Sequence, residues 1–310
     1  MVQPTYVTGS SGVLGFEILR HLSAQGAGPV TGVARRPLPE TGEGLLQITT
    51  PEVLHPAWLE GKDATVIHCA GLSDARASFG SIAELTQRMV LPQVTMVEAL
   101  LARGWRGHFV YLSSAAVYGD AEVLPIPETQ QPAPRGFYAL HKLAVEEALA
   151  FLAAHHGFPL TILRIANPYG TSLPRRERGV LRLLLAAAEA GSGFTVYGSG
   201  EGLRDYLHIS DFLSAVRRVR ERPPERAEGW VRRLNLGSGQ GTSLNELIAR
   251  VEAATGREIA TRREPSTLEV GSNVLDIARA QAALDWTPSV PLDEGVARMA
   301  EDFARQAEPG

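Results

Sequence analysis

Cysteine is almost absent from this chain of 310 residues, which contains only Cys69. A single cysteine excludes an intrachain disulfide and a zinc site built from cysteines. It is also typical of proteins kept in a reducing compartment. We therefore expect a cytoplasmic protein without a structural metal.

Long apolar runs and concentrated positive charge are lacking too. No apolar run reaches the roughly 18 residues that a membrane-spanning helix needs, and the N-terminus has no secretion signal pattern. Hydrophobic residues make up 44%, charged residues 21%, and the net charge is −4. The arginine-bearing stretch 215–233 also holds acids and prolines, as a solvated helix end does. These values predict a soluble globular protein that binds neither membranes nor nucleic acid.

What is present is a regular alternation of apolar strands and amphipathic helices. Strands are predicted at 4–8, 29–34, 64–69, 108–113 and 159–165, and helices at 12–25, 81–103 and 137–155. Several strands, such as "ATVIHCA" and "LTILRI", lack polar alternation, as expected when helices cover both faces of a sheet. The pattern predicts an α/β fold with a Rossmann-type, doubly wound parallel sheet.

Beyond residue 167 the pattern changes to turn-rich segments and shorter helices, at 179–191, 210–221 and 243–255. We expect a dinucleotide-binding domain over residues 1–166 and a smaller, irregular substrate-binding lobe over 167–310. Segments at roughly 205–237 are expected to pack back on the first domain.

A glycine-rich turn follows the first predicted strand. Gly9, Gly12 and Gly15 have the spacing G-x-x-G-x-x-G between a strand and a helix. Glycines there allow a tight turn and let the backbone approach a pyrophosphate at the helix N-terminus. With Val13 and Leu14 they are predicted to bind a dinucleotide cofactor; the alternative is a flexible glycine loop.

The second predicted strand ends in Arg35 and Arg36. NAD-binding enzymes usually carry an acidic residue near this point for the ribose 2′-hydroxyl, whereas an arginine suits the 2′-phosphate of NADP. The alternative is that both arginines are solvated in a loop. From these residues the cofactor is therefore NAD or NADP.

Tyr138 and Lys142, in the segment "YALHK", lie one helical turn apart on one face. A lysine held there is expected to favour the phenolate and so to lower the pKa of the tyrosine. Ser114, at the end of a strand, is placed to hydrogen-bond the same substrate oxygen. Such a trio moves a proton on or off a carbinol while a hydride leaves or reaches its carbon.

Eight motifs in chain order resemble the extended short-chain dehydrogenase/reductases that act on nucleotide sugars, the NAD-dependent epimerase/dehydratase family. They are the glycine turn 9–15, "DATVIHCAG" (63–71), "SSAAVYG" (113–119), "YALHK" (138–142), "LRIANPYG" (163–170), "VYGSGEGLRDYLHISD" (196–211), "NLGSG" (235–239) and "DIARAQAALDWTP" (276–288). The resemblance implies that Ser114, Tyr138 and Lys142 are catalytic. It also implies that Ala70 and Gly71 lie against the cofactor, which Tyr138 and Lys142 contact as well.

For the substrate, the resemblance implies that Asn167 and Arg204 face the phosphates of a nucleotide-diphosphate sugar and that Tyr197 lies near the nucleobase. A guanidinium is also the natural bidentate partner of a diphosphate. The alternative for Arg204 is an internal salt bridge to Asp205 or Asp211.

Some residues depart from the family pattern. Ala115 and Ala116 stand where sugar 4,6-dehydratases carry acidic residues, so elimination of water is not expected. Met89 stands where the family commonly has asparagine, which removes one hydrogen bond behind the tyrosine. No aspartate follows the third strand, in "LLQITTPE", where the family often contacts adenine.

Three histidines accompany these motifs. His68 and His208, at the edges of apolar strands, are interpreted as hydrogen-bonded structural residues. His141, between Tyr138 and Lys142, is expected on another helix face, exposed or at a subunit contact.

The resemblance favours a nucleotide-sugar epimerase that acts at C4 through a transient 4-keto sugar. The first alternative is an NADPH-dependent reductase of a 4-keto-6-deoxy nucleotide sugar, which Arg35 and Arg36 would suit. The second is a non-catalytic dinucleotide-sensing protein, which the intact trio disfavours.

The helices at 81–103 and 137–155 carry apolar residues on more than one side. Such helices lie in a larger core or pair with another subunit. The resemblance favours a homodimer, with Leu101 and Leu149 among the interface candidates and a covered monomer as the alternative.

Overall fold

A seven-stranded sheet organises the first part of the molecule. The computed structural model describes residues 3–26, 28–38, 44–71, 80–121, 123–172, 179–265 and 271–307. In spatial order the strands are β10 (Val231–Leu236), β6 (Leu160–Ile165), β5 (Phe109–Ser114), β4 (Thr65–His68), β1 (Thr5–Thr8), β2 (Val30–Ala34) and β3 (Gln47–Thr49). The pairings from β6 through to β3 are parallel, so the predicted Rossmann-type sheet is confirmed.

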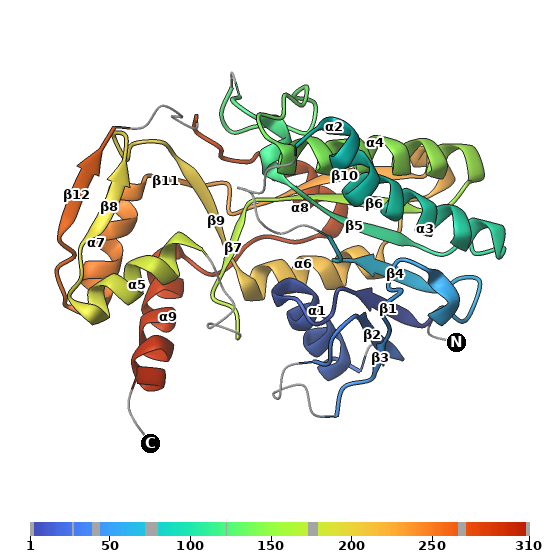
Figure 1. Cartoon of the computed structure of the whole chain (residues 1–310), viewed down its shortest axis with the longest axis horizontal. Helices are drawn as coiled ribbons and strands as arrows, with labels where there is room; N and C mark the ends of the chain where they lie inside the picture. Colours follow the sequence, from blue (N-terminus) through green and yellow to red (C-terminus); the bar gives the residue numbers. More distant parts are fainter. Residues whose placement is uncertain are drawn as a thin grey trace. The chain divides into compact units, whose positions relative to one another are not determined.

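Helices cover both faces of this sheet, which is why its central strands are buried. In Figure 1, α1 (Val13–Ala24) lies on one face, and α3 (Leu91–Ala102) and α4 (Phe137–His156) lie side by side on the other. Every residue of β1, β4 and β6 is buried. The short helices η2 (Pro56–Trp58) and η4 (Ala115–Tyr118) complete this part.

The helix predicted at 81–103 is interrupted, which corrects the sequence-based expectation. It consists of α2 (Ile82–Leu85), a π-helical turn η3 (Thr86–Val90) and α3. Pro92 at the start of α3 explains the interruption. Proline has no backbone N–H and its ring clashes with the carbonyl four residues earlier, so the turn before it widens.

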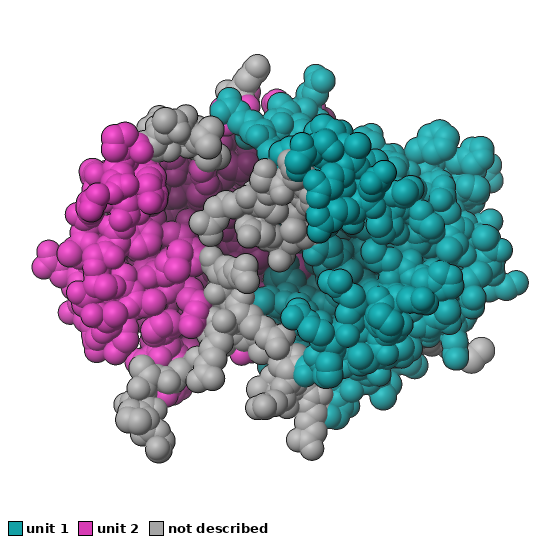
Figure 2. Space-filling view, in the orientation of Figure 1, with its two compact units in different colours: residues 1–119, 131–165, 215–234 teal, residues 120–130, 166–214, 235–310 magenta. Residues whose placement is uncertain are grey.

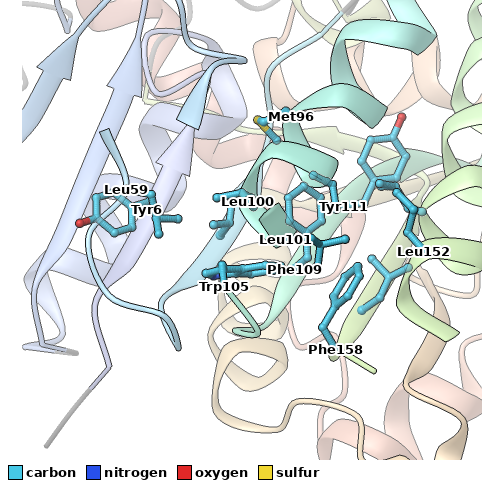
Figure 3. Packing of buried hydrophobic residues seen from close by; sticks show 14 of the residues in the cluster. Tyr6, Leu59, Met96, Leu100, Leu101, Trp105, Phe109, Tyr111, Leu152 and Phe158 are labelled. Carbon is cyan, nitrogen blue, oxygen red and sulfur yellow. The ribbon is translucent and has the colours of Figure 1, made fainter. Parts of the chain in front are cut away.

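The core beneath α3 and α4 combines large aromatic side chains with aliphatic ones (Figure 3). The Trp105 ring centroid lies 6.2 Å from that of Phe109 and 5.5 Å from that of Phe158. Its indole N–H donates to the Ala64 carbonyl at 2.8 Å, so the one polar atom of this buried ring is satisfied.

The chain divides into two compact units, coloured in Figure 2. Unit 1 contains Met1–Gly119, Gln131–Ile165 and Ala215–Leu234, and unit 2 contains Asp120–Gln130, Ala166–Ser214 and Asn235–Gly310. Among the described residues, no helix has the length and apolarity of a membrane span.

Unit 2 has its own small sheets and core. Its sheets are β11 (Gly241–Thr242) with β9 (Arg204–His208) and β7 (Asn167–Tyr169), and β12 (Thr261–Glu264) with β8 (Phe194–Tyr197). A buried cluster joins α5 (Val180–Ala190), α7 (Leu244–Thr255) and α9 (Leu292–Ala307); α8 (Ala278–Leu284) is shorter. The helices predicted at 179–191, 210–221 and 243–255 are confirmed as α5, α6 (Ile209–Glu221) and α7.

Candidate active site

The strand order reverses between β1 and β4 in unit 1. Thr8 and His68, the last residues of these strands, are register partners, so the strands end side by side. In open parallel sheets, ligands bind beyond the carboxyl ends of the strands at such a reversal. The glycine turn follows β1 and Ala70 and Gly71 follow β4, so these predicted cofactor residues lie at this point of the sheet.

Gly9 brings the two chain segments into contact. Its φ is +72°, and a Cβ atom there would lie 2.7 Å from the Ala70 nitrogen. A larger residue at position 9 would therefore be strained and would collide with the backbone after β4. Gly12 donates its N–H to the Gly9 carbonyl at 2.9 Å and caps α1, whose first turn holds Val13, Leu14 and Gly15. A helix N-terminus so exposed by glycines suits a pyrophosphate.

Arg35 and Arg36 directly follow β2, and both side chains are exposed. The Arg36 carbonyl accepts a hydrogen bond of 2.8 Å from the Gln47 side-chain amide, which ties this loop to β3. An exposed pair fits both a 2′-phosphate ligand and simple solvation, so their role stays a prediction.

The structure brings the side chains of Ser114, Tyr138 and Lys142 together. Ser114 ends β5, and its hydroxyl oxygen accepts from the Ala116 N–H at 3.2 Å. The Ser114 side chain lies close enough to Tyr138 to favour its deprotonated form. Lys142, one turn further along α4, donates from Nζ to the Leu112 carbonyl at 2.7 Å and lies 5.9 Å from the Tyr138 ring centroid.

Burial controls the charges of this trio. Lys142 is only 8% exposed, and burial lowers the pKa of its ammonium to about 8, although Cys69 and Glu146 oppose the shift. Burial also raises the pKa of Tyr138, against the effect of Ser114. In the protein without its cofactor the pKa of this tyrosine is thus raised and not lowered, because burial outweighs the interaction with Ser114.

The sequence analysis did not identify a buried ion pair next to this trio. Glu146, one turn after Lys142, accepts from Arg164 Nη2 at 2.7 Å and from Arg164 Nε at 3.1 Å, and Ser113 Oγ also donates to it. The Arg164 guanidinium carbon lies 4.8 Å from the Tyr118 ring centroid. The available signal was an arginine inside the otherwise largely apolar strand "LTILRI", since a buried charge requires a partner.

The expected surroundings of the histidines are found for His68 but not for His141. His68 is buried and hydrogen-bonded to Thr8 at 2.8 Å and Gln93 at 3.2 Å, which confirms its structural interpretation. The expectation that His141 is exposed or at a subunit contact is wrong. Its side chain is fully buried, and its ring meets the Tyr138 ring edge-on, with 5.5 Å between the ring centroids. Residue i+3 lies on nearly the same helix face as residue i, so His141 follows Tyr138 inward. Burial lowers the pKa of His141 to about 4.

The predicted substrate residues belong to unit 2. Asn167 begins β7 and donates from its side-chain amide to the Asp205 carbonyl at 2.8 Å. Arg204 begins β9 and donates from Nη1 to the Leu203 and Gly271 carbonyls at 2.8 and 2.9 Å. Tyr197 ends β8 with 64% of its surface exposed.

The alternative salt-bridge partners of Arg204 are engaged elsewhere. The Asp205 carboxylate accepts from the Ser238 N–H and hydroxyl, both at 2.7 Å. The Asp211 carboxylate accepts from the Ser289 hydroxyl and the Val290 N–H, both at 2.9 Å. Among the described residues, neither aspartate forms an ion pair with Arg204, whose guanidinium donates to backbone carbonyls instead.

Comparison with known proteins identifies the family of the chain. The family model described as "NAD dependent epimerase/dehydratase family" matches residues 5–237, which include the glycine turn, the serine, the tyrosine and the lysine. The chain belongs to this family. Membership of the epimerase/dehydratase family means that the chain is an enzyme of the extended short-chain dehydrogenase/reductase type.

Relatives within the family include both epimerases and reductases. A UDP-glucose 4-epimerase from Corynebacterium glutamicum is 31% identical over 264 residues, covering 79% of this chain and 76% of the relative. A GDP-6-deoxy-D-mannose reductase from Pseudomonas aeruginosa is 29% identical over 318 residues and covers 98% of both chains. The crystal structure of a UDP-glucose 4-epimerase from Thermotoga maritima with UDP-glucose has a TM-score of 0.85 and 26% identity, covering 99% of this chain and 100% of the other.

Proposed function

We propose that this protein is a nucleotide-sugar 4-epimerase. The observation that carries the proposal is the side-chain cluster of Ser114, Tyr138 and Lys142 in the unit that also holds the glycine turn. The similarity to UDP-glucose 4-epimerases supports the choice of reaction.

The residues of unit 1 suit an oxidation followed by a reduction at one carbon. Bound at the Gly9–Gly15 turn and against Ala70 and Gly71, a nicotinamide dinucleotide supplies the acceptor and then the donor of a hydride. Tyr138 takes the C4-hydroxyl proton of the sugar and later returns it. Ser114 hydrogen-bonds the same oxygen, and the ammonium of Lys142 favours the deprotonated phenol.

Inversion requires that the 4-keto sugar present its other face before the hydride returns. The small side chains of Ala115 and Ala116, next to Ser114, leave room for this rotation. Their lack of a carboxylate also removes the acid–base pair that a dehydratase needs.

We assign substrate binding to unit 2 and cofactor binding to unit 1, close to the division into residues 1–166 and 167–310 predicted from sequence. Arg204 and Asn167 bind the diphosphate and Tyr197 the nucleobase. The two carbonyls that accept from Arg204 Nη1 hold its guanidinium in place, and a fixed guanidinium suits a diphosphate. The exposed ring of Tyr197 is free to stack on a base.

For the cofactor we propose NAD, which the family description supports. NADP is the alternative, favoured by Arg35 and Arg36 and by the absence of an acidic residue in the described segment directly after β2. The cofactor released by denaturing the purified protein, identified by mass, decides between them.

A second candidate function is reduction of a 4-keto-6-deoxy nucleotide sugar with the same trio. The similarity to a GDP-6-deoxy-D-mannose reductase along nearly the whole chain favours it. In that reaction the hydride is delivered once and the reduced cofactor is consumed.

Absorbance at 340 nm separates the two functions. Uridine, thymidine and guanosine diphosphate hexoses and their 4-keto-6-deoxy derivatives are incubated with the protein, and products are identified by NMR. The epimerase converts a hexose to its C4 epimer without a net change at 340 nm. Stoichiometric loss of added NADPH with a 4-keto-6-deoxy sugar would instead establish the reductase.

We also propose a cytoplasmic homodimer. Ile82, Leu91 and Phe151, on α2, α3 and α4, are 57%, 54% and 69% exposed. Apolar side chains exposed on neighbouring helices suit a self-complementary helical interface. Cys69, the single cysteine, is a free thiol, as is typical of a reducing compartment.

A further inference from the structure

Gln93 is a buried amide whose position follows from the π-helical turn η3. It is 3% exposed and lies in the first turn of α3, directly after Pro92. Its side-chain N–H donates to the carbonyl of Met89, inside η3. The side chain therefore bonds one of the carbonyls of the widened turn, and its own amide is held against the helix.

The other end of the amide completes a chain of hydrogen bonds. Because the Gln93 nitrogen donates to Met89, its Oε1 atom is the acceptor in the 3.2 Å contact with His68 Nε2. His68 therefore carries its proton on Nε2, and its Nδ1 accepts from the Thr8 hydroxyl at 2.8 Å. Burial lowers the pKa of His68 to about 3, so the ring is neutral, as this chain of bonds requires.

This chain connects the two segments of the predicted cofactor cradle. Thr8 directly precedes Gly9, and His68 precedes Cys69, Ala70 and Gly71. A Cβ atom at Gly71 would lie 3.9 Å from both polar atoms of the Gln93 side chain. The amide thus bonds the last residue of β4, His68, directly and the end of β1 through it, and it lies beside Gly71.

We propose that Gln93 is a positioning residue for the cofactor: through His68 and Thr8 it fixes the ends of β1 and β4 at the spacing that cofactor binding requires. It supplies, one turn later, the side-chain amide that Met89 cannot provide. This inference rests on the proposed cofactor binding.

The test replaces Gln93 by methionine, which has similar length and no hydrogen-bonding amide. Gln87→Met is the matched control, because Gln87 is exposed on η3. We expect the dissociation constant of NAD, measured by titration of the full chain freed of its cofactor, to rise about tenfold or more in Gln93→Met. Gln87→Met should stay within about twofold of the wild type.

A merely structural role would lower the melting temperature without changing NAD affinity. A folded Gln93→Met protein that binds NAD as tightly as the wild type therefore overturns the proposal. In Gln93→Met with Met89→Asn, an amide returns to the preceding turn, and we expect most of the lost affinity to return with it.

If Gln93→Met does not fold, Thr8→Val decides the question, because it removes only the hydroxyl at the far end of the chain of bonds. Weaker NAD binding by folded Thr8→Val supports the proposal, and unchanged binding overturns it. A wild-type protein that binds neither NAD nor NADP would instead contradict the proposed function, which is a different outcome.

Discussion

Tyr138, Lys142 and Glu146 occupy successive turns of α4, so a phenol, an ammonium and a carboxylate share one helix face. Of these three residues, Lys142 is the one whose charge responds most directly to pH near neutrality. Burial lowers the pKa of its ammonium to about 8, while the negative charge of Glu146 acts in the opposite direction. Lys142 therefore loses its charge close to neutral pH, and any step that needs this charge depends on pH there.

We predict that kcat/KM falls as the pH rises through about 8. The sign follows because deprotonation removes the positive charge that favours the phenolate of Tyr138. In Lys142→Arg the guanidinium stays charged throughout this range, so the variant, even if slower, should lack this decline. The measurement is a pH–rate profile of both proteins with saturating cofactor. An identical alkaline decline in both would assign it to another group.

Between elements, the Glu146–Arg164 pair joins α4 to β6, and Ser113 on β5 also bonds the carboxylate. Both charged side chains are at most 2% exposed. Removing one partner leaves the other charge buried and unpaired, which costs more than the pair contributes.

We predict that Glu146→Leu lowers the free energy of unfolding by about 3–5 kcal/mol. The double variant Glu146→Leu with Arg164→Met should lose much less than the sum of the two single variants, because no lone charge remains. Urea denaturation measures both. Glu294→Leu, which breaks the exposed pair with Arg298, is the control and should change stability by less than about 1 kcal/mol. Additive losses at 146 and 164 would contradict this account.

The sequence predicted the elements whose signals are local. Apolar strands, the glycine turn and the four-residue spacing of Tyr138 and Lys142 lie within short windows, and the parallel sheet follows from their order. The π-helical turn was missed although its signal was present, because Pro92 stands in the middle of the helix predicted at 81–103 and a proline there disrupts a helix. The Glu146–Arg164 pair and the burial of His141 were missed because they depend on which side chains meet across elements.

At the scale of the whole molecule, the exposed apolar side chains differ in part from those expected. Leu101 and Leu149 are buried in the core of unit 1 and are therefore wrong as interface candidates. Ile82, one of the apolar residues expected on more than one side of the helix at 81–103, is exposed, and so are Leu91 and Phe151. A charge at these positions tests association without damaging the core.

We predict that the wild type has a mass near twice the 33.3 kDa of one chain, and that Phe151→Glu with Leu91→Glu shifts it toward one chain mass. Burying two like charges at a symmetric interface brings each close to its copy, which opposes pairing. Light scattering at micromolar concentration gives the mass. Leu183→Glu on α5, 53% exposed, is the control and should remain dimeric. A wild-type mass of one chain would refute the dimer.

The central claim is that one hydride leaves C4 of the sugar and returns to its other face. The most direct measurement uses the nucleotide sugar that is turned over fastest, labelled with deuterium at C4. We predict that the C4 epimer forms with the deuterium still on C4 and none in water or in free reduced cofactor. Tyr138→Phe should form it at least about a hundredfold more slowly. Deuterium lost to solvent, or a C4 label that accumulates in released reduced cofactor, would contradict the account.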